Sequence, residues 1–290
     1  MTVAGFDEEI TVIPRWRRIG GHMLQSRAAC VGATILLILF VLALFAPWIA
    51  PYDPFKIDPI HRLAAPSAAH WIGTDEVGRD LASRIIYGTR YFLLICLVTA
   101  AISSSIGTLL GLLAGAGSPL VDGVIMRFID ILLAFPYILM VLVVVAVAGP
   151  SLWTGMVAVG IAGIPGYARL VRSTVLTVRQ EDYVTVARAL GASRREILFG
   201  TILPNVLSPL IVYLAFATPL SALIASALSF VGLGAQPPAP EWGAMLVNSR
   251  TYLFSAWWAV AAPGLALCIS IFGMNILGNG LRDVLDPRNA

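Results

Sequence analysis

The stretch EDYVTVARALGASRREILFGTILP, residues 181–204, is a polar segment between two strongly apolar ones. Its acidic start, Glu181–Asp182, suits the positive end of a helix dipole. Tyr183, Ala187 and Leu190 then recur at helical spacing. The first half of the stretch therefore predicts a short helix with one apolar face.

The second half of this stretch carries signals for a turn and another helix. Gly191 can adopt the left-handed conformation that ends many helices. Ser193 and Glu196 have the spacing of a capping box, which marks a helix start. Pro204 then opens a long apolar run. The whole stretch predicts a helix, a sharp turn and a second helix that continues into a membrane span.

Two arginines in this stretch lie where the dipole of their own predicted helix is unfavourable for a positive charge. Arg194 and Arg195 fall in the first turn of the predicted second helix, where the dipole disfavours cations. Contact with anionic lipid headgroups is one explanation, because basic residues near a membrane surface commonly make it. Contact with a protein partner is the other. The residues alone favour neither.

The composition of the chain indicates an all-α integral membrane protein. Of its 290 residues, 58% are hydrophobic and only 12% are charged, and the mean hydropathy is +0.86. In a soluble domain about a quarter of the residues would be charged. The net charge of +3 gives no electrostatic basis for binding nucleic acid.

The apolar runs are long enough for transmembrane helices, each of which needs about 20 residues. They predict six spans, at about residues 28–50, 91–114, 128–148, 152–171, 204–233 and 255–277. The second span is rich in Ser and Gly, and small residues let membrane helices approach closely. We therefore expect the second span to pack inside the bundle.

The distribution of basic residues predicts the orientation, because cytoplasmic segments carry an excess of Arg and Lys. With the N-terminus inside, 13 of the 19 basic residues fall on the cytoplasmic side and six on the other. Both termini are then cytoplasmic. Residues 1–27 and 278–290 become cytoplasmic end segments, residues 51–90 an extracytoplasmic loop, and residues 181–203 a cytoplasmic loop.

Few charged residues are candidates for chemistry. Asp130 lies near the start of an apolar run and suggests either a proton relay or an ion pair with Arg127, three residues earlier. We favour the ion pair. The extracytoplasmic loop holds five potential metal ligands without the spacing of a known site, so a packed loop is expected there: His61, His70, Asp75, Glu76 and Asp80.

The sequence contains no recognisable means of hydrolysing a substrate. It has no Walker A loop, nucleophile elbow or zinc-protease helix. We therefore predict a chain that is not an enzyme and binds no cofactor or metal of its own.

Four motifs resemble one family, the permease subunits of ATP-binding-cassette importers, in its dipeptide/oligopeptide/nickel branch. The family's coupling loop follows the pattern EAA, three residues, Gly, nine residues, I-x-L-P. Ala187, Gly191 and Leu203–Pro204 fall in register with it, whereas Thr185–Val186 and Thr201 depart from it. The other three matches are GTDEVGRDLASRIIYG (73–88), AQPPAPEWGAML (235–246) and GNGLRDVLDPR (278–288).

The resemblance implies a type I importer permease fold over residues 28–290, in a bacterial plasma membrane. It also implies a heterodimer with a second six-span permease, two ATPases that bind ATP and magnesium, and an extracytoplasmic solute-binding protein. The loop over 181–203 would dock an ATPase through these residues: Asp182, Tyr183, Ala187, Arg188, Leu190, Gly191, Ser193, Arg194, Arg195 and Glu196. Within that set, Arg188, Arg194 and Arg195 are expected to steer the ATPase.

The cargo cannot be read from the chain. The branch favours di- or oligopeptides, and nickel or another small solute is the alternative within the same family. A secondary transporter is a further alternative, which would need ionisable residues or broken helices near the middle of the membrane. The sequence offers only Gly163, Pro165–Gly166 and Pro219 as hints of such breaks.

Overall fold

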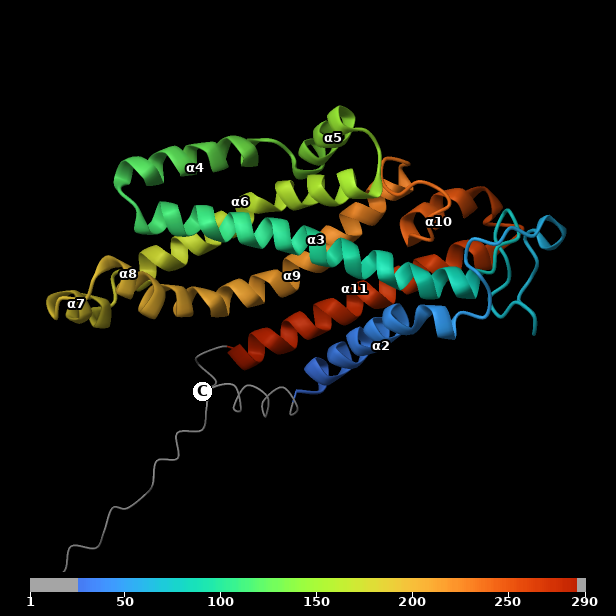
Figure 1. Ribbon diagram of the computed structural model, residues 1–290, viewed down its shortest axis with the longest axis horizontal. Coiled ribbons are helices and arrows are strands. Elements are labelled where there is room, and N and C mark those ends of the chain that lie inside the picture. The colour runs from blue at the N-terminus through green and yellow to red at the C-terminus, as the bar shows by residue number, and fades with distance from the viewer. Residues whose placement is uncertain (1–25, 286–290) are drawn as a thin grey trace, which may run out of the picture.

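The computed structural model describes residues 26–285 as a bundle of long helices that lie side by side (Figure 1). Within the described residues, five helical segments are long and apolar enough to cross a membrane, and a bent pair brings the number up to six. The long helices are α2 (Arg27–Ile49), α3 (Leu81–Ala116), α6 (Leu152–Val178), α9 (Leu203–Phe230) and α11 (Trp257–Leu285). The predicted all-α membrane fold is confirmed.

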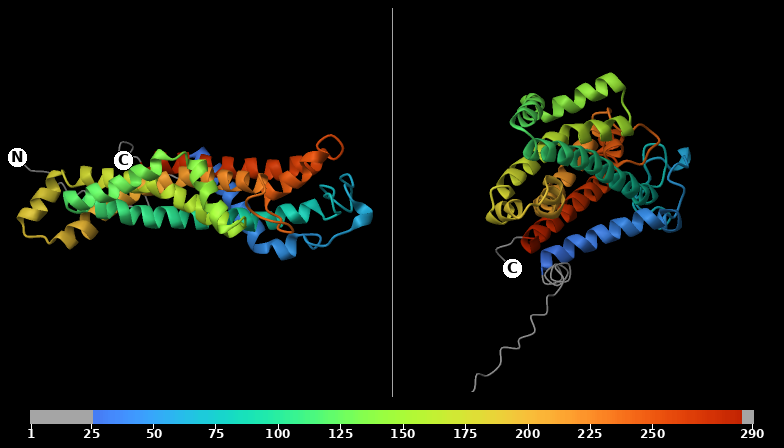
Figure 2. Two further views of the ribbon diagram at one scale, coloured as in Figure 1. Left: turned by 90° about the horizontal axis from the view of Figure 1, so that it is seen from above. Right: turned by 60° about the vertical axis from the view of Figure 1, so that its left-hand side comes forward.

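The two ends of the bundle differ in what they carry, as two further views show (Figure 2). One end holds the short helices α7 (Asp182–Ala189) and α8 (Arg194–Ile197). The other holds residues 51–80, with the short turn η1 (Pro59–His61), and the segment α10 (Trp242–Ser249) and η3 (Arg250–Tyr252). The predicted terminal segments mostly lie outside the described residues, and residues 278–285 simply continue α11.

The third predicted span is wrong as a single straight helix. It consists of α4 (Pro119–Ala134) and α5 (Tyr137–Ala148), which are bent by 90° relative to each other. The break falls at Phe135, whose backbone is extended, and at Pro136. Proline disfavours the helical conformation in the residue before it, and this explains the position of the bend.

The second span begins earlier than its apolar run suggests. Helix α3 starts at Leu81, so the last ten residues of the predicted extracytoplasmic loop are helical. Asp80 caps this helix by accepting a hydrogen bond of 2.8 Å from the backbone N–H of Ser83. The cap at Asp80 starts α3 within a polar stretch. Hydropathy alone therefore placed the start of this helix too late in the sequence.

Helix α3 packs against α6 along a stripe of small residues, as expected for an inner span. Ser103 donates a hydrogen bond of 2.8 Å to the carbonyl of Gly160. Gly107 and Gly111 follow at intervals of four residues, and an added Cβ on Gly107 would lie 2.4 Å from the Cβ of Tyr167. This spacing brings the two backbones together and lets the two helices pack closely.

Two ion pairs tie α4 to α6. Asp130 bonds to Arg169 with an Oδ1–Nη2 distance of 2.7 Å, and Asp122 bonds to Arg172 with an Oδ2–Nη2 distance of 2.6 Å. The expected pair between Asp130 and Arg127 is therefore wrong. The helix that packs alongside supplies the partner, and the spacing within one helix could not indicate it.

Candidate functional site

The predicted polar stretch folds into helices α7 and α8, which lie between the long helices α6 and α9 in the chain (Figure 1). These two short helices and the turn between them are called the α7–α8 module. Helix α7 ends in a Schellman turn: Gly191 has φ +88°, and its N–H donates to the carbonyl of Arg188 at 3.1 Å. The N–H of Ala192 donates to the carbonyl of Ala187 at 3.1 Å. The left-handed turn predicted at Gly191 is confirmed.

Helix α8 begins with the predicted capping box. The backbone N–H of Ser193 donates to Oε2 of Glu196 at 2.6 Å, and the N–H of Glu196 donates to Oγ of Ser193 at 3.3 Å. Both bonds satisfy donors that a helix start otherwise leaves without partners. The two caps together fix the angle between α7 and α8.

One buried side chain anchors this module to the bundle. Val184 is fully buried and packs in a cluster with Val175, Ile197 and Ile202, from α6, α8 and the following turn. No signal in the sequence marks Val184 as an anchor, because it lies outside the helical spacing of Tyr183, Ala187 and Leu190. Its position one residue after Tyr183 places it on a different face of α7 from the predicted apolar stripe.

The stripe itself stays exposed. Tyr183 is 48% exposed, Val186 is 56% exposed and Leu190 is 83% exposed, whereas Ala187 is half-buried. Within residues 26–285, the chain's own surface therefore leaves most of this stripe uncovered. Helix α7 is thus anchored by one buried side chain and leaves an apolar face exposed. Helices that bind in the groove of a partner protein present such a face.

The connection from α8 to α9 is continuous. A π-helical turn, η2 (Leu198–Ile202), joins the two helices before Pro204. Proline lacks an N–H and cannot complete the usual helical ladder. The π-helical turn is closed by the N–H of Leu203, which donates to the carbonyl of Leu198, and Nδ2 of Asn205 donates to the carbonyl of Thr201 at 2.7 Å. The module is therefore joined to a membrane helix without a flexible linker.

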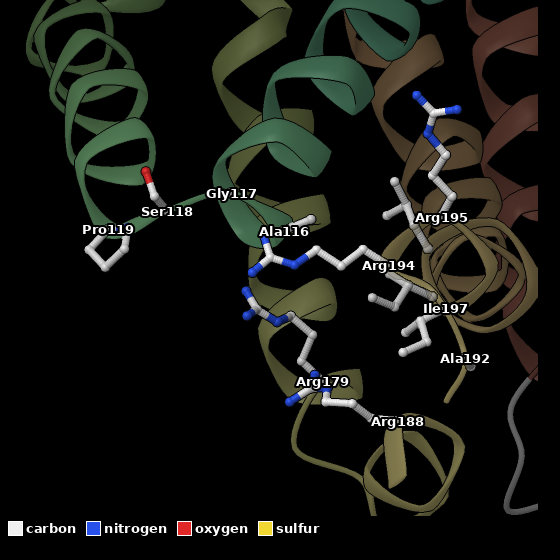
Figure 3. A pocket seen from close by; sticks show the side chains of 12 residues that line it. Ala116, Gly117, Ser118, Pro119, Arg179, Arg188, Ala192, Arg194, Arg195 and Ile197 are labelled. Atoms are coloured by element: carbon white, nitrogen blue, oxygen red, sulfur yellow. The ribbon is translucent and has the colours of Figure 1, made fainter. Parts of the chain in front are cut away.

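The predicted steering arginines do not lie together. Arg188 and Arg194 point toward the same space beside Ala116, where Arg179 joins them, whereas Arg195 extends in another direction (Figure 3). These side chains line a cleft of about 670 Å³ between the α7–α8 module and the turn that joins α3 to α4. The structure thus separates the arginines into two groups.

At the opposite end of the bundle, two of the motif stretches meet. Arg84 donates from Nη1 to the carbonyls of Pro54 and Pro238, at 3.0 Å and 3.3 Å. Trp242 donates from Nε1 to the carbonyl of Ile85 at 3.3 Å. Residues 73–88 and 235–246 therefore form one packed unit, although about 150 residues separate them in sequence.

Carboxylates within residues 51–80 form ion pairs and hydrogen bonds that stabilise this packed unit. Asp75 and Arg79 are both buried and pair at 2.6 Å, and Nδ1 of His70 lies 2.9 Å from Oδ1 of Asp80. On the surface, His61 holds the pKa of the Asp58 carboxyl below its ordinary value by a side-chain hydrogen bond. The packed loop expected from the sequence is confirmed.

Glu241 caps α10 from a buried position. It is 2% exposed, and its carboxylate oxygens accept from the N–H of Gly243 at 3.0 Å and from the N–H of Ala244 at 2.8 Å. Ser226 on α9 donates a further bond at 3.0 Å. Burial nevertheless raises the pKa of the Glu241 carboxyl, because desolvation outweighs these bonds.

Comparison with known families decides the class of the chain. Residues 107–290 match the family described as binding-protein-dependent transport system inner membrane component. Residues 15–66 match the N-terminal transmembrane domain of oligopeptide transport permease C. The chain belongs to this permease family. It is therefore a multi-pass inner-membrane permease of an ATP-binding-cassette importer, and ATP hydrolysis in such systems belongs to other subunits.

Curated relatives of the permease cover nearly its whole length. It is 45% identical over 263 residues to the probable D,D-dipeptide transport system permease protein DdpC of Escherichia coli, covering 91% of this chain and 88% of the relative. It is 44% identical to the di/tripeptide transport system permease protein DppC of Pseudomonas aeruginosa, covering 91% and 89%. The glutathione transport system permease protein GsiD of Pectobacterium atrosepticum is 42% identical, with 94% and 91% covered.

A solved structure shares the fold of the permease. A chain of the MetNI methionine ABC transporter, solved in inward-facing conformations, aligns with a TM-score of 0.58 at 16% sequence identity. The alignment covers 71% of this chain and 98% of that one. The importer permease fold predicted from the sequence is therefore confirmed.

Proposed function

We propose that this permease forms half of the translocation pathway for di- or oligopeptides. It would pair with a second six-span permease, two ATPases that bind ATP and magnesium, and an extracytoplasmic solute-binding protein. The cargo class is carried over from relatives whose names specify D,D-dipeptides, di- and tripeptides, and glutathione. Nickel or another small solute is the alternative within the family.

The proposal places the α7–α8 module in the cytoplasm, as the site that receives an ATPase. The excess of Arg and Lys supports this orientation, with 13 of 19 basic residues on the same side of the membrane as the module. Helix α7 would insert its exposed face into a groove of the ATPase, with Tyr183 and Leu190 as anchors. Arg195, which points away from the Arg188 side of the cleft, is placed to steer that partner.

The proposal rests on two features of α7 together. Its apolar face is exposed, and capped turns and a continuous helix connect it to α9. Leu190 is 83% exposed, yet it precedes a Schellman turn, a capping box and a continuous helical connection into α9. A movement of α7 would therefore pass into α6 and α9 and would not be absorbed by a loop. The proposed coupling rests on this stiffness.

Leu190→Asp tests the docking step. A carboxylate at the centre of the apolar contact loses the burial of leucine, which is worth about 1.5–3 kcal/mol, and adds the cost of desolvating a charge. We expect the yield of ATPase that co-purifies with the permease pair to fall at least tenfold.

The matched control is Leu253→Asp, which adds the same charge at a 47% exposed leucine of the opposite end. It should leave co-purification at the wild-type level. Equal ATPase recovery from the Leu190→Asp and wild-type permeases would refute docking through α7.

A further inference from the structure

Among the described residues, four arginines and no acidic residue line the cleft beside the α7–α8 module, although the guanidinium of Arg195 extends away from the other three (Figure 3). Its volume is about 670 Å³. Arg179 donates from Nη1 to the carbonyl of Gly115 at 2.6 Å. Within residues 26–285, the guanidinium groups of Arg188 and Arg194 make no hydrogen bond and no ion pair that would neutralise them. The cleft therefore concentrates positive charge that no residue in the described part of the chain balances.

The arrangement of the guanidinium groups favours one compact anion. Those of Arg179, Arg188 and Arg194 converge beside Ala116, and three elements of the fold supply them (Figure 3). Like charges held this close repel each other unless a counter-charge occupies the space between them. Guanidinium groups bind phosphate oxygens through parallel N–H bonds, and several of them can share one phosphate.

The surroundings of the cleft indicate a lipid as the source of that phosphate. The other walls of the cleft are the end of α3, the start of α4 at Pro119, and apolar side chains such as Ile197. On α4, Leu120 is 78% exposed and Val124 is 65% exposed, so an apolar surface continues from the cleft along this helix. A headgroup in the cleft would leave its acyl chains beside that surface, whereas a soluble phosphate would make no use of it.

We propose that this cleft binds the headgroup of an anionic phospholipid, with Arg188 and Arg194 on its phosphodiester and Arg179 beside them. The bound lipid would join the end of α6 to α7 and α8, because Arg179 follows α6 as its C-cap, Arg188 lies on α7 and Arg194 on α8. The α3–α4 turn forms the facing wall of the cleft. Basic pockets between membrane helices are known to select such headgroups. The inference requires that this end of the bundle lies at a membrane surface, as the proposed function places it, and it does not depend on the choice of cargo.

The test measures the affinity of the intact transporter, with its partner subunits, for spin-labelled phosphatidylglycerol in phosphatidylcholine nanodiscs. The double variant Arg188→Gln/Arg194→Gln removes the two charges that have no partner. At about 1 kcal/mol for each basic residue near the surface, the affinity should fall about 30-fold. Spin-labelled phosphatidylcholine should bind both proteins equally and weakly.

Arg195→Gln is the matched control, because it removes one arginine of the same module whose guanidinium points elsewhere. It should keep the wild-type affinity. An equal loss in this control would mean a diffuse surface potential and would overturn the proposal, as would an unchanged affinity in the double variant. The Arg188→Lys/Arg194→Lys variant should recover most of the binding, which separates loss of charge from loss of fold.

Two further binding measurements on the wild-type transporter identify which molecule occupies the cleft. Inorganic phosphate at millimolar concentration should leave the labelled lipid bound, and displacement would indicate a site for free anions. Labelled phosphatidylglycerol should bind with the ATPases in place. Binding only after the ATPases are stripped would show that a carboxylate of the ATPase fills the cleft. Either of these contrary results overturns the proposal.

Discussion

At the residue scale, Gly191 is the position at which backbone conformation matters most for the proposed coupling. Its φ of +88° lies in the left-handed region, where a side chain costs about 1–2 kcal/mol. Space is not the obstacle, because an added Cβ would meet nothing within 4 Å. Gly191→Val should therefore strain the turn between α7 and α8 without any clash.

We expect Gly191→Val to lower the peptide transported per ATP hydrolysed, while ATP hydrolysis continues. The measurement is uptake and phosphate release in the same proteoliposomes. Gly200→Val is the control, since a Cβ there also meets nothing within 4 Å and its φ is not left-handed. A Gly191→Val transporter that couples as well as the Gly200→Val control would contradict a rigid turn.

The buried carboxyl of Glu241, at the other end of the bundle, should make the stability of the permease depend on pH. Burial raises the pKa of its carboxyl above the ordinary value of 4.5, so the folded state disfavours the carboxylate. The contribution of Glu241 to stability is therefore complete below about pH 4.5 and is lost as the pH rises through the folded-state pKa. A side chain that cannot ionise escapes this loss.

Glu241→Gln should accordingly gain stability relative to the wild type as the pH increases from 4.5 to 8. Thermal unfolding of the purified transporter across this range measures the difference. A difference in melting temperature that is constant with pH, or that moves against the variant, would show that Glu241 remains ionised at no cost.

The sequence was most informative about residues whose partners are nearby in the chain. Gly191, Ser193 and Glu196 were assigned correctly because a cap depends on residues within three or four positions. The partner of Asp130 was assigned wrongly because Arg169 belongs to another helix. Val184 was missed for the same reason, since only the packing of α6 and η2 around it makes it a buried anchor.

At the element scale, the contact between α3 and α6 is the rigid base of the module. A Cβ on Gly107 would lie 2.4 Å from Tyr167 Cβ and 2.9 Å from the carbonyl oxygen of Ile164. Alanine normally improves a helix by about 0.5–1 kcal/mol over glycine. Here the clash should dominate, because forcing extra volume into a packed contact costs about 1–3 kcal/mol.

Gly107→Ala is therefore expected to lower the thermal stability of the permease, measured by the loss of monodisperse protein on heating. Gly123→Ala on α4 is the matched control, because an added Cβ there meets nothing within 4 Å. It should be neutral or slightly stabilising. If Gly107→Ala proved as stable as Gly123→Ala, the close approach of α3 and α6 would be wrong.

Helix existence was easier to predict than helix shape. The apolar runs correctly predicted the helices α2, α9 and α11, because length and hydropathy mark long apolar helices. The bend between α4 and α5 was missed, although Pro136 was a visible signal within the apolar run. The start of α3 at Leu81 was missed because its cap, Asp80, lies in a polar motif that hydropathy assigns to a loop.

At the scale of the whole molecule, the permease has two specialised ends joined by long helices. One end is a packed unit made from two motif stretches, held by Arg84 and Trp242. The other is a stiff module with an exposed apolar face and an arginine-lined cleft. Long, tightly packed helices such as α3 and α6 can carry a displacement between these ends with little loss.

The measurement that tests this account most directly is dipeptide uptake into proteoliposomes containing the permease pair and its ATPases, with the binding protein outside. We predict that uptake requires ATP on the side of the α7–α8 module, the ATPases and the binding protein. It should fall at least tenfold in Leu190→Asp and stay at the wild-type level in Leu253→Asp. Uptake that continues without ATP or ATPases, or that is unaffected by Leu190→Asp, would contradict the account.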